Sequence, residues 1–352
     1  MPPSAAFWRA KRVFLTGHTG FKGSWLTVCL SELGAEVHGL SLAPPTSPAM
    51  FDSCALSSLL ASDTRADIRD AAAVQQAMQV AQPDIVLHLA AQPLVKASYV
   101  SAADTYETNV MGTLRVLDAV RQSSSVKSVV VVTTDKCYEN REWAWPYREI
   151  DALGGHDPYS SSKACAEILL SSYRRSFFAE AGVAVATARA GNVIGGGDWA
   201  QDRLVPDFLR AMDAGEALSV RAPGAIRPWQ HVLEPLHGYL LLAERLYQEG
   251  QAFADAWNFG PAEEDCRSVG WIADALCELD SRASWQRDQV PHPHEAGLLK
   301  LDSSKALSRL GWRPRWHLHQ ALRYTLAWHH AWLAGSDMLA LTRQQIHAYW
   351  QH

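Results

Sequence analysis

One pair of residues in the sequence could remove a proton from an alcohol. Tyr159 and Lys163 stand four residues apart in YSSSK, at the start of a helical segment, so both side chains project from one face of that helix. A phenol with a reference pKa of about 10 acts as a base at neutral pH only beside a cation, which a lysine one turn away can supply. The spacing Y-x-x-x-K is common by chance, so its meaning depends on its surroundings.

A second stretch, TTDKCYENREW over residues 133–143, sets an acid directly beside a base. Asp135 and Lys136 follow an apolar run and the polar residues Thr133 and Thr134, which read as the end of a strand. Such a pair could give and take protons during catalysis. A surface ion pair after a buried strand is the alternative, and it would be the better interpretation if Tyr159 and Lys163 were absent.

A glycine-rich loop indicates a dinucleotide site. TGHTGFKG follows the first apolar strand and opens a helix, which is the strand–turn–helix context that such a motif requires. The glycines permit a tight turn and allow backbone N–H groups to approach a pyrophosphate at a helix N-terminus. The cofactor-binding residues predicted in this loop are Gly17, Gly20, Phe21, Lys22 and Gly23.

The end of the second strand bears on the choice of cofactor. HGLSLAPPTSP has neither the acid that usually grips the adenosine ribose nor an arginine for a 2′-phosphate, which favours NAD over NADP, with Ser41 or backbone groups as substitutes. Asp67 and Ile68 suit an adenine edge, although they could equally be ordinary strand-end sequence. The same holds for the small segment that would let a cofactor lie close to the backbone, namely Leu89, Ala90 and Ala91.

Alternating strands and helices must position these residues. Apolar strands are predicted at 12–17, 36–42, 84–90, 128–134 and 183–191, and helices at 21–33, 71–80, 104–121 and 159–180. This alternation is typical of an α/β fold with a Rossmann-type, doubly wound parallel sheet.

After residue 191 the alternation gives way to loops rich in glycine and proline. Helices at 204–214 and 232–248, a strand at 256–260 and a helical tail at 312–352 follow. We therefore expect two domains that are discontinuous in sequence. The dinucleotide-binding domain comprises 1–190 plus about 230–260, and a smaller C-terminal α/β substrate domain comprises about 191–229 plus 261–352.

Composition excludes several classes of function. The chain has 352 residues, 48% of them hydrophobic, and a net charge of −5, which gives no basic field for nucleic acid or anionic lipid. No apolar run suits a signal peptide or a membrane span, so a cytoplasmic location is expected. The six cysteines lack metal-ligand spacing, and the histidines of 291–295 and His329-His330 are predicted to be exposed, so no metal site is expected.

The longer motifs carry a family resemblance. TGHTGFKG, Thr134, YSSSK and the closing LDSSKALSRLGWRP (301–314) resemble the extended short-chain dehydrogenase/reductase family across essentially the whole chain. TTDKCYENREW, GNVIGGGDW and RPWQHV resemble its branch that dehydrates CDP-glucose. This resemblance implies bound NAD, CDP-glucose as the substrate, and loss of water to give CDP-4-keto-6-deoxyglucose in deoxysugar biosynthesis.

The resemblance also implies roles for the reactive residues. Thr134, Tyr159 and Lys163 match the oxidation apparatus, and Asp135 and Lys136 the elimination apparatus, where related dehydratases usually have Asp-Glu. An acid role for Asp135 with a base role for Lys136 needs both groups neutral, against a reference pKa difference of about 6.5 units, or roughly 9 kcal/mol. Burial could supply the shift; otherwise the pair stays ionised and Lys136 acts as an electrostatic stabiliser.

Substrate and partner expectations complete the sequence-based prediction. The residues predicted to bind the substrate are Asn192, Arg203 and Arg227. The guanidinium groups of the two arginines suit its two phosphates. Trp229 is either a base-stacking residue or a core aromatic. The helices at 104–121 and 159–180 are expected to form a homodimer, as the resemblance suggests. A nucleotide-sugar 4-epimerase and a non-catalytic dinucleotide-binding regulator are the alternative functions.

Overall fold

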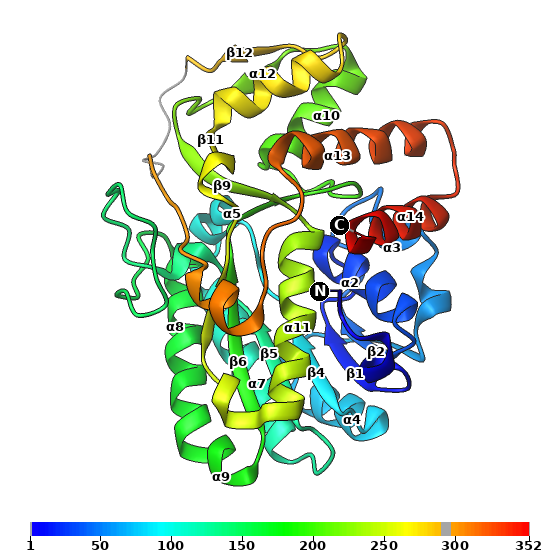
Figure 1. Ribbon diagram of the computed structural model, residues 1–352, viewed down its shortest axis with the longest axis vertical. Helices are drawn as coiled ribbons and strands as arrows, with labels where there is room; N and C mark the ends of the chain where they lie inside the picture. Colours follow the sequence, from blue (N-terminus) through cyan, green and yellow to red (C-terminus); the bar gives the residue numbers. More distant parts are fainter. Residues whose placement is uncertain (1, 290–296, 352) are drawn as a thin grey trace.

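The computed structural model describes residues 2–289 and 297–351, and a seven-stranded parallel sheet forms its centre. Figure 1 shows this sheet below a second group of strands and helices. The strand order of the central sheet is β10 (Ala256–Phe259), β6 (Ala184–Ala190), β5 (Ser128–Val132), β4 (Ile85–His88), β1 (Arg12–Thr16), β2 (Glu36–Ser41) and β3 (Ser62–Arg65).

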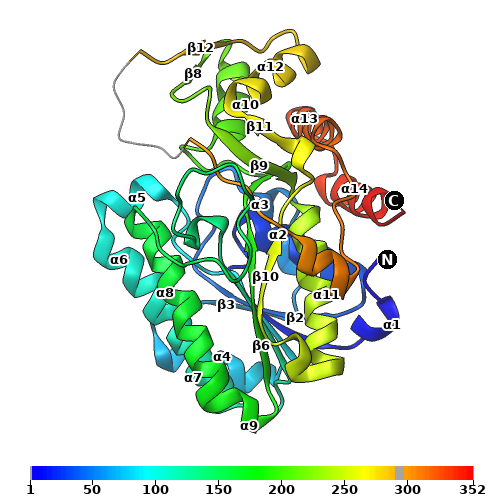
Figure 2. The ribbon, with the colours of Figure 1, turned by 60° about the vertical axis from the view of Figure 1, so that its left-hand side comes forward.

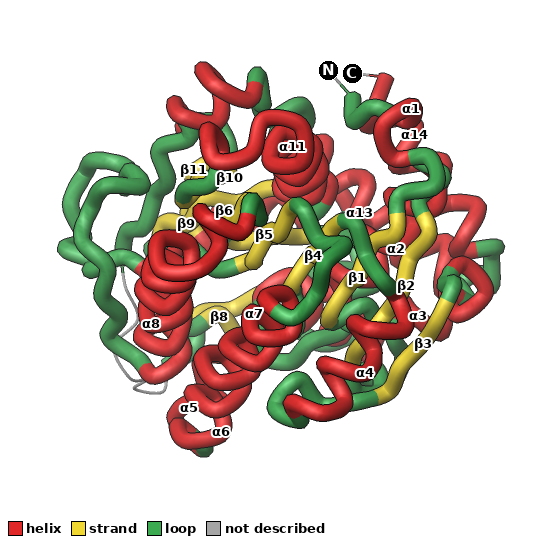
Figure 3. Tube along the Cα trace, turned by 90° about the horizontal axis from the view of Figure 1, so that it is seen from below, coloured by secondary structure: helices red, strands yellow, loops and turns green. Residues whose placement is uncertain are grey.

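Helices cover both faces of the sheet, because its strands are apolar on both faces. Val13 and Leu15 of β1 belong to one apolar cluster, whereas Phe14 between them belongs to the other. Figure 3 shows the two helical layers on opposite sides of the strands. The first layer contains α2 (Phe21–Glu32) and α11 (Leu233–Glu249), and the second contains α4 (Ala71–Ala81), α7 (Thr113–Arg121) and α8 (Pro158–Tyr173). The predicted Rossmann-type fold is confirmed.

The smaller group of elements packs around its own apolar cluster. Its sheets have the orders β11 (Cys266–Ser268), β9 (Ile226–His231), β7 (Asn192–Ile194), and β12 (Trp285–Arg287), β8 (Leu218–Val220). Its helices are α10 (Leu204–Ala214), α12 (Val269–Leu279) and α13 (Leu318–Leu333), and α14 (Met338–Gln351) packs against α2. Figure 2 shows this group beyond the upper ends of the central strands. The predicted domain boundaries stay a prediction.

The shorter elements complete the description. They are α1 (Ala5–Trp8), α3 (Met50–Ser53), α5 (Val95–Val100), α6 (Ala102–Tyr106) and α9 (Ala179–Ala181). The segment predicted as one helix at 104–121 continues from α6 through a π-helical stretch at Glu107–Gly112 into α7. Within the described ranges, no helix is long and apolar enough to cross a membrane. The cytoplasmic location stays a prediction.

Candidate active site

A cavity of about 1170 Å³ opens at the carboxyl ends of the central strands. From β1 the chain passes outward to β2 and β3 and then returns to place β4 on the other side of β1, so the strand order reverses between β1 and β4. Ligands of doubly wound sheets bind at this switch point. The elements of the smaller group supply the opposite wall through residues of β7, β8 and β9.

The glycine-rich loop folds so tightly that two of its positions have no space for a side chain. Gly17 has a φ of +77°, and a Cβ atom there would lie 2.8 Å from the backbone nitrogen of Ala90. A Cβ atom on Gly23 would lie 2.0 Å from the carbonyl oxygen of Gly17. The loop therefore folds tightly against the end of β4 and leads into α2, and Gly20, Phe21 and the other loop residues line the cavity. These residues fit a dinucleotide pyrophosphate.

The residues proposed for the adenosine side line the same cavity, with different surroundings. Ser41 accepts or donates a 2.8 Å hydrogen bond with Thr19. Asp67 is paired with Arg69 at 2.7 Å, and Ile68 is buried in an apolar cluster. The wall after β4 consists of Leu89, Ala90 and Ala91. The structure thus brings these residues to one cavity, while their contacts to an adenine ring stay a prediction.

Tyr159 begins a helix that is fixed by its first turn. Asp157 caps α8 by accepting the backbone N–H of Ser160 at 2.9 Å, and Pro158 occupies the first helical position. Burial raises the pKa of the Tyr159 phenol to about 12, while a hydrogen bond with Thr134 and the charge of Arg203 oppose this rise. The phenol therefore needs a nearby cation when it acts as a base.

Lys163 lies one turn after Tyr159 on α8. Burial lowers the pKa of its ammonium to about 8, and the charge of Glu167 opposes this change. Its Nζ atom donates a 3.3 Å hydrogen bond to the carbonyl oxygen of Val132. Lys163 is thus held at the carboxyl end of β5, and its ammonium loses its proton at a lower pH than that of an exposed lysine.

Asp135 lies in a 3₁₀ turn, Asp135–Cys137, that follows β5 and is capped by Thr134. Its side chain is only 1% exposed, and Oδ1 accepts a 3.0 Å hydrogen bond from the Thr134 hydroxyl. Oδ2 has no hydrogen-bond partner among the described residues. Burial raises the pKa of this carboxyl, although Lys136, Thr134 and Arg227 all oppose the rise. Burial thus shifts Asp135 in the direction that a proton donor requires.

Lys22 is a feature of the site that the sequence did not place beside the acid–base residues. Burial lowers the pKa of its ammonium to about 7, Arg203 and Lys163 lower it further, and Asp135 opposes them. These charge effects place the Lys22 ammonium near the reactive residues. A lysine inside a loop that otherwise needs small residues was the signal available in the sequence.

The predicted substrate residues lie on the opposite wall. Asn192 begins β7 and pairs with Trp229 of β9, and Arg227 on β9 is buried and lines the cavity. Arg203 pairs with Asp198 at 3.5 Å. Because the charge of Arg203 acts on Tyr159 and Lys22, it lies near the reactive end of the cavity.

Two further predictions are settled by burial. Trp229 is buried in the apolar cluster of the smaller group and donates its Nε1 proton to the carbonyl of Arg267 at 3.0 Å, so it is a core aromatic at the cavity wall. His329 was predicted to be exposed, which is wrong, because it is buried and hydrogen-bonded to Asp213 at 2.9 Å. The histidines of 291–295 lie outside the described residues. Within the described ranges, no cluster of three potential ligands could hold a metal ion.

The sequence matches the GDP-mannose 4,6 dehydratase family over residues 14–325. The chain belongs to this family. It is 52% identical over 349 residues to CDP-glucose 4,6-dehydratase of Salmonella typhimurium, with 97% of each chain covered. It is 29% identical to dTDP-glucose 4,6-dehydratase of Shigella flexneri, covering 81% of this chain and 82% of that one. The family resemblance inferred from the motifs is confirmed.

Solved structures show that the fold of this GDP-mannose 4,6 dehydratase family member is shared more widely. The dTDP-glucose 4,6-dehydratase DesIV from Streptomyces venezuelae, with NAD and TYD bound, has a TM-score of 0.76 at 24% identity and covers 93% of this chain and 99% of its own. A UDP-glucose-4-epimerase from Stenotrophomonas maltophila has a TM-score of 0.81 at 22% identity and covers 93% and 100%. At these identities the likeness shows the fold alone.

Proposed function

We propose that the protein is an NAD-dependent CDP-glucose 4,6-dehydratase, which converts CDP-glucose to CDP-4-keto-6-deoxyglucose and water. The observation that carries this proposal is the 52% identity to CDP-glucose 4,6-dehydratase along 97% of both chains. The cavity supports it, because the acid Asp135 and the base candidate Lys136 line the same space as Tyr159 and Lys163. A 4-epimerase eliminates no water and would therefore not need this acid–base pair.

The glycine-rich loop and the wall after β4 would hold NAD. When bound, NAD supplies the acceptor for the hydride of C4 and its later return to C6. The residues proposed for this contact surround the tight turn of Gly17 and Gly23, where side chains are sterically excluded. We also propose that 1–190 plus about 230–260 form the cofactor domain, and that about 191–229 plus 261–352 form the nucleotide-sugar domain.

Oxidation of the sugar needs a base for the 4-hydroxyl. Tyr159, as phenolate, would accept this proton while Thr134 orients the hydroxyl by a hydrogen bond. Lys163 would stabilise the phenolate, and it can do so because its ammonium is still largely protonated below a pKa of about 8. The electrons of the broken C4–H bond leave as hydride, and C4 becomes a ketone.

Loss of water then requires an acid and a base at neighbouring carbons. The 4-ketone makes the C5 proton acidic, and Lys136 is the candidate to accept it as the C5–C6 double bond forms. Asp135 would donate its proton to the departing 6-hydroxyl, which leaves as water. The raised pKa of Asp135 supports this role, because burial shifts the carboxyl toward the protonated form that a proton donor needs.

The substrate diphosphate would meet arginine side chains on the opposite wall. Arg227, buried on β9, is the first candidate, and Asn192 at the start of β7 would contact the sugar nucleotide. The charge of Arg203 acts on the Tyr159 phenol, so its proposed contact lies closer to the reacting sugar than the sequence suggested.

We also propose that the protein forms a homodimer through the helices at 104–121 and 159–180. Figure 2 shows α7 and α8 side by side on one flank of the molecule. Large apolar side chains are exposed on or beside these helices, and Ile168 of α8 is 60% exposed. Burial of such residues is a common source of dimer stability. Light scattering should give twice the mass of the chain, and Ile168→Asp should lower it.

Product analysis tests the proposed reaction. The purified protein is incubated separately with CDP-, dTDP-, GDP- and UDP-glucose and with NAD or NADP, and the products are identified by mass. CDP-glucose with NAD should lose the mass of one water. A product of unchanged mass in which C4 is inverted would favour the epimerase. Turnover of another sugar nucleotide in preference to CDP-glucose would contradict the proposed preference for the cytidine nucleotide.

A further inference from the structure

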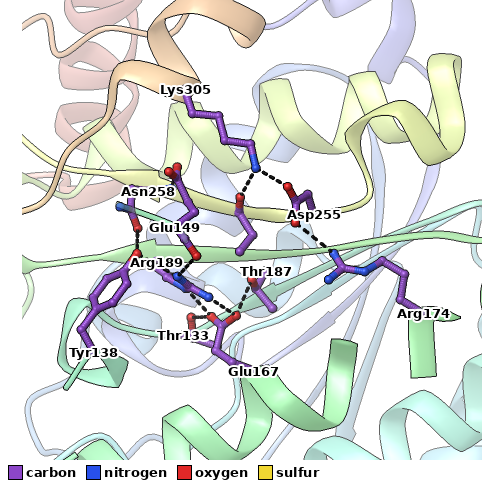
Figure 4. A network of polar contacts seen from close by, with 11 residues as sticks. Thr133, Tyr138, Glu149, Glu167, Arg174, Thr187, Arg189, Asp255, Asn258 and Lys305 are labelled. Carbon is purple, nitrogen blue, oxygen red and sulfur yellow. Dashed lines mark hydrogen bonds and ion pairs between the residues drawn. The ribbon is translucent and has the colours of Figure 1, made fainter. Parts of the chain in front are cut away.

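A buried ion pair lies directly behind the residues proposed to carry the reaction. Glu167 of α8 and Arg189 of β6 are 4% and 3% exposed. The Arg189 guanidinium donates two parallel hydrogen bonds to the Glu167 carboxylate, from Nε to Oε1 at 2.9 Å and from Nη2 to Oε2 at 2.8 Å. Figure 4 shows the pair at the centre of a larger polar network. Burying both charges costs desolvation energy, so we looked for a functional role of this ion pair.

The carboxylate connects the catalytic segment to the neighbouring strand. The Thr133 hydroxyl donates to Oε1 and the Thr187 hydroxyl donates to Oε2, the latter at 2.8 Å. Thr133 directly precedes Thr134, whereas Thr187 lies in the middle of β6. Each carboxylate oxygen therefore accepts one hydrogen bond from the guanidinium and one from a hydroxyl group. Both threonines donate to the same carboxylate, but only Thr133 belongs to the catalytic segment and lines the cavity.

The guanidinium holds the other end of the same segment. Arg189 Nη1 donates to the Tyr138 hydroxyl at 2.7 Å, and that hydroxyl donates to Oδ1 of Asn258 at 2.7 Å. Tyr138 directly follows the turn Asp135–Cys137. As Figure 4 shows, Thr133 and Tyr138 therefore approach the ion pair from the two ends of the turn. The residues between them include Thr134, Asp135 and Lys136.

The negative charge of Glu167 also acts on Lys163. Glu167 lies one turn after Lys163 on α8, so the two side chains share a helix face. The Glu167 charge raises the pKa of Lys163 against the larger lowering effect of burial. A neutral residue at position 167 would remove that effect and leave the charge of Arg189 uncompensated.

We propose that Glu167 and Arg189 are positioning residues that fix the catalytic turn at both ends. This inference rests on the proposed dehydratase function, because it assigns the turn its catalytic purpose. Neither residue lines the cavity, so both act through Thr133, Tyr138 and Lys163 and not on the substrate itself.

Two threonine variants test the positioning role. Thr133→Val and Thr187→Val each remove one hydroxyl from the same carboxylate, with little change in side-chain shape. Thr133→Val should lower kcat with CDP-glucose at least about tenfold, because small displacements of reacting groups are costly in rate. Thr187→Val should change kcat less than about twofold, and KM should change less than about twofold in both. Thr133→Ser, which keeps the hydroxyl, should restore most of the lost kcat.

Thermal unfolding of both variants shows whether they are folded and equally stable. An equal fall of kcat in Thr133→Val and Thr187→Val would overturn the positioning role, as would a Thr133→Ser variant no better than Thr133→Val. Wild-type protein that gives no dehydrated product would overturn the proposed function, and the inference with it. Turnover by wild type with equal threonine effects would overturn the inference alone.

The pH dependence of kcat tests the effect on Lys163. In Glu167→Gln, the fall of activity on the alkaline side should move to lower pH than in wild type, because Lys163 loses its proton more readily. Thr187→Val should keep the wild-type position. An alkaline fall at the same pH in Glu167→Gln and wild type would overturn the charge role, whatever the size of the rate loss.

Discussion

The burial of Asp135 predicts that removing its charge stabilises the protein while abolishing dehydration. Its Oδ2 atom has no hydrogen-bond partner within the described residues, and burial raises the pKa of the carboxyl. A carboxyl with a raised folded-state pKa weakens stability as pH rises above its unfolded value of about 3.9. Asp135→Asn should therefore be more stable than wild type at pH 8, and the difference should be smaller near pH 4.

The expected size follows from the missing hydrogen bond. A buried polar group without a partner costs about 1–3 kcal/mol, and the asparagine amide recovers only part of this. For a chain of 352 residues the unfolding entropy is about 0.7 kcal/mol per degree, so a gain of about 1–2 kcal/mol corresponds to a Tm rise of roughly 1–3 °C. Removal of the carboxylate also lowers the pKa of Lys22 further. The Lys22 ammonium can then lose its proton, which ends its charge repulsion with Lys163.

A carboxylate with the opposite pKa direction supplies the control. Asp280 accepts hydrogen bonds from Arg282 at 3.0 and 2.6 Å, and these lower its pKa. Asp280→Asn should therefore lose stability at pH 8 while keeping activity, since it does not line the cavity. Melting curves at pH 4 and pH 8 and assays of the 4-keto product measure both effects. A fall in Tm for Asp135→Asn as large as that for Asp280→Asn would refute the reasoning.

Three further predictions concern the cofactor loop and the two lysines. Lys136→Met should keep some hydride exchange at C4 but lose dehydration, measured with deuterated CDP-glucose; equal loss of both would argue against a separate elimination role. Gly23→Ala should abolish NAD binding in calorimetry, because its Cβ would meet a backbone oxygen at 2.0 Å, while Gly224→Ala, with open space around it, should bind normally. Lys163→Met should remove a charge-burial penalty of about 3 kcal/mol below pH 8, so its Tm advantage over wild type should shrink as pH rises from 8 to 10.5.

The central strands were predictable because they are apolar on both faces. The runs at 128–134 and 183–191 contain the observed strands β5 and β6 within two residues at each end. In contrast, β3 reads SDTR and alternates between half-buried and exposed positions, so its sequence carries no apolar signal. Its place in the sheet depends on hydrogen bonds to β2, which the sequence does not reveal.

The candidate site divides in the same way. Asp135 and Lys136 were predicted because they are consecutive, and Tyr159 and Lys163 because they share one helical turn. All four line one cavity, while their catalytic roles stay a prediction. Glu167 and Arg189 were missed. Charged residues are rarely fully buried, so a sequence places them on the surface unless their partners are known. Here the ion pair and its partners come from α8, β6 and the turn after β5, which meet only in the folded protein (Figure 4).

Burial also changes the main objection to Asp135 as a proton donor. In water an acid and an amine favour the ion pair by roughly 9 kcal/mol, which would leave no proton on the carboxyl. In the cavity, burial raises the pKa of Asp135 and lowers those of Lys22 and Lys163 to about 7 and about 8, so each described shift favours the neutral form. Proton transfer is most efficient between groups whose pKa values lie near the working pH. Burial in one cavity can therefore shift Asp135 toward its role, although its second oxygen has no hydrogen-bond partner among the residues that the structure describes.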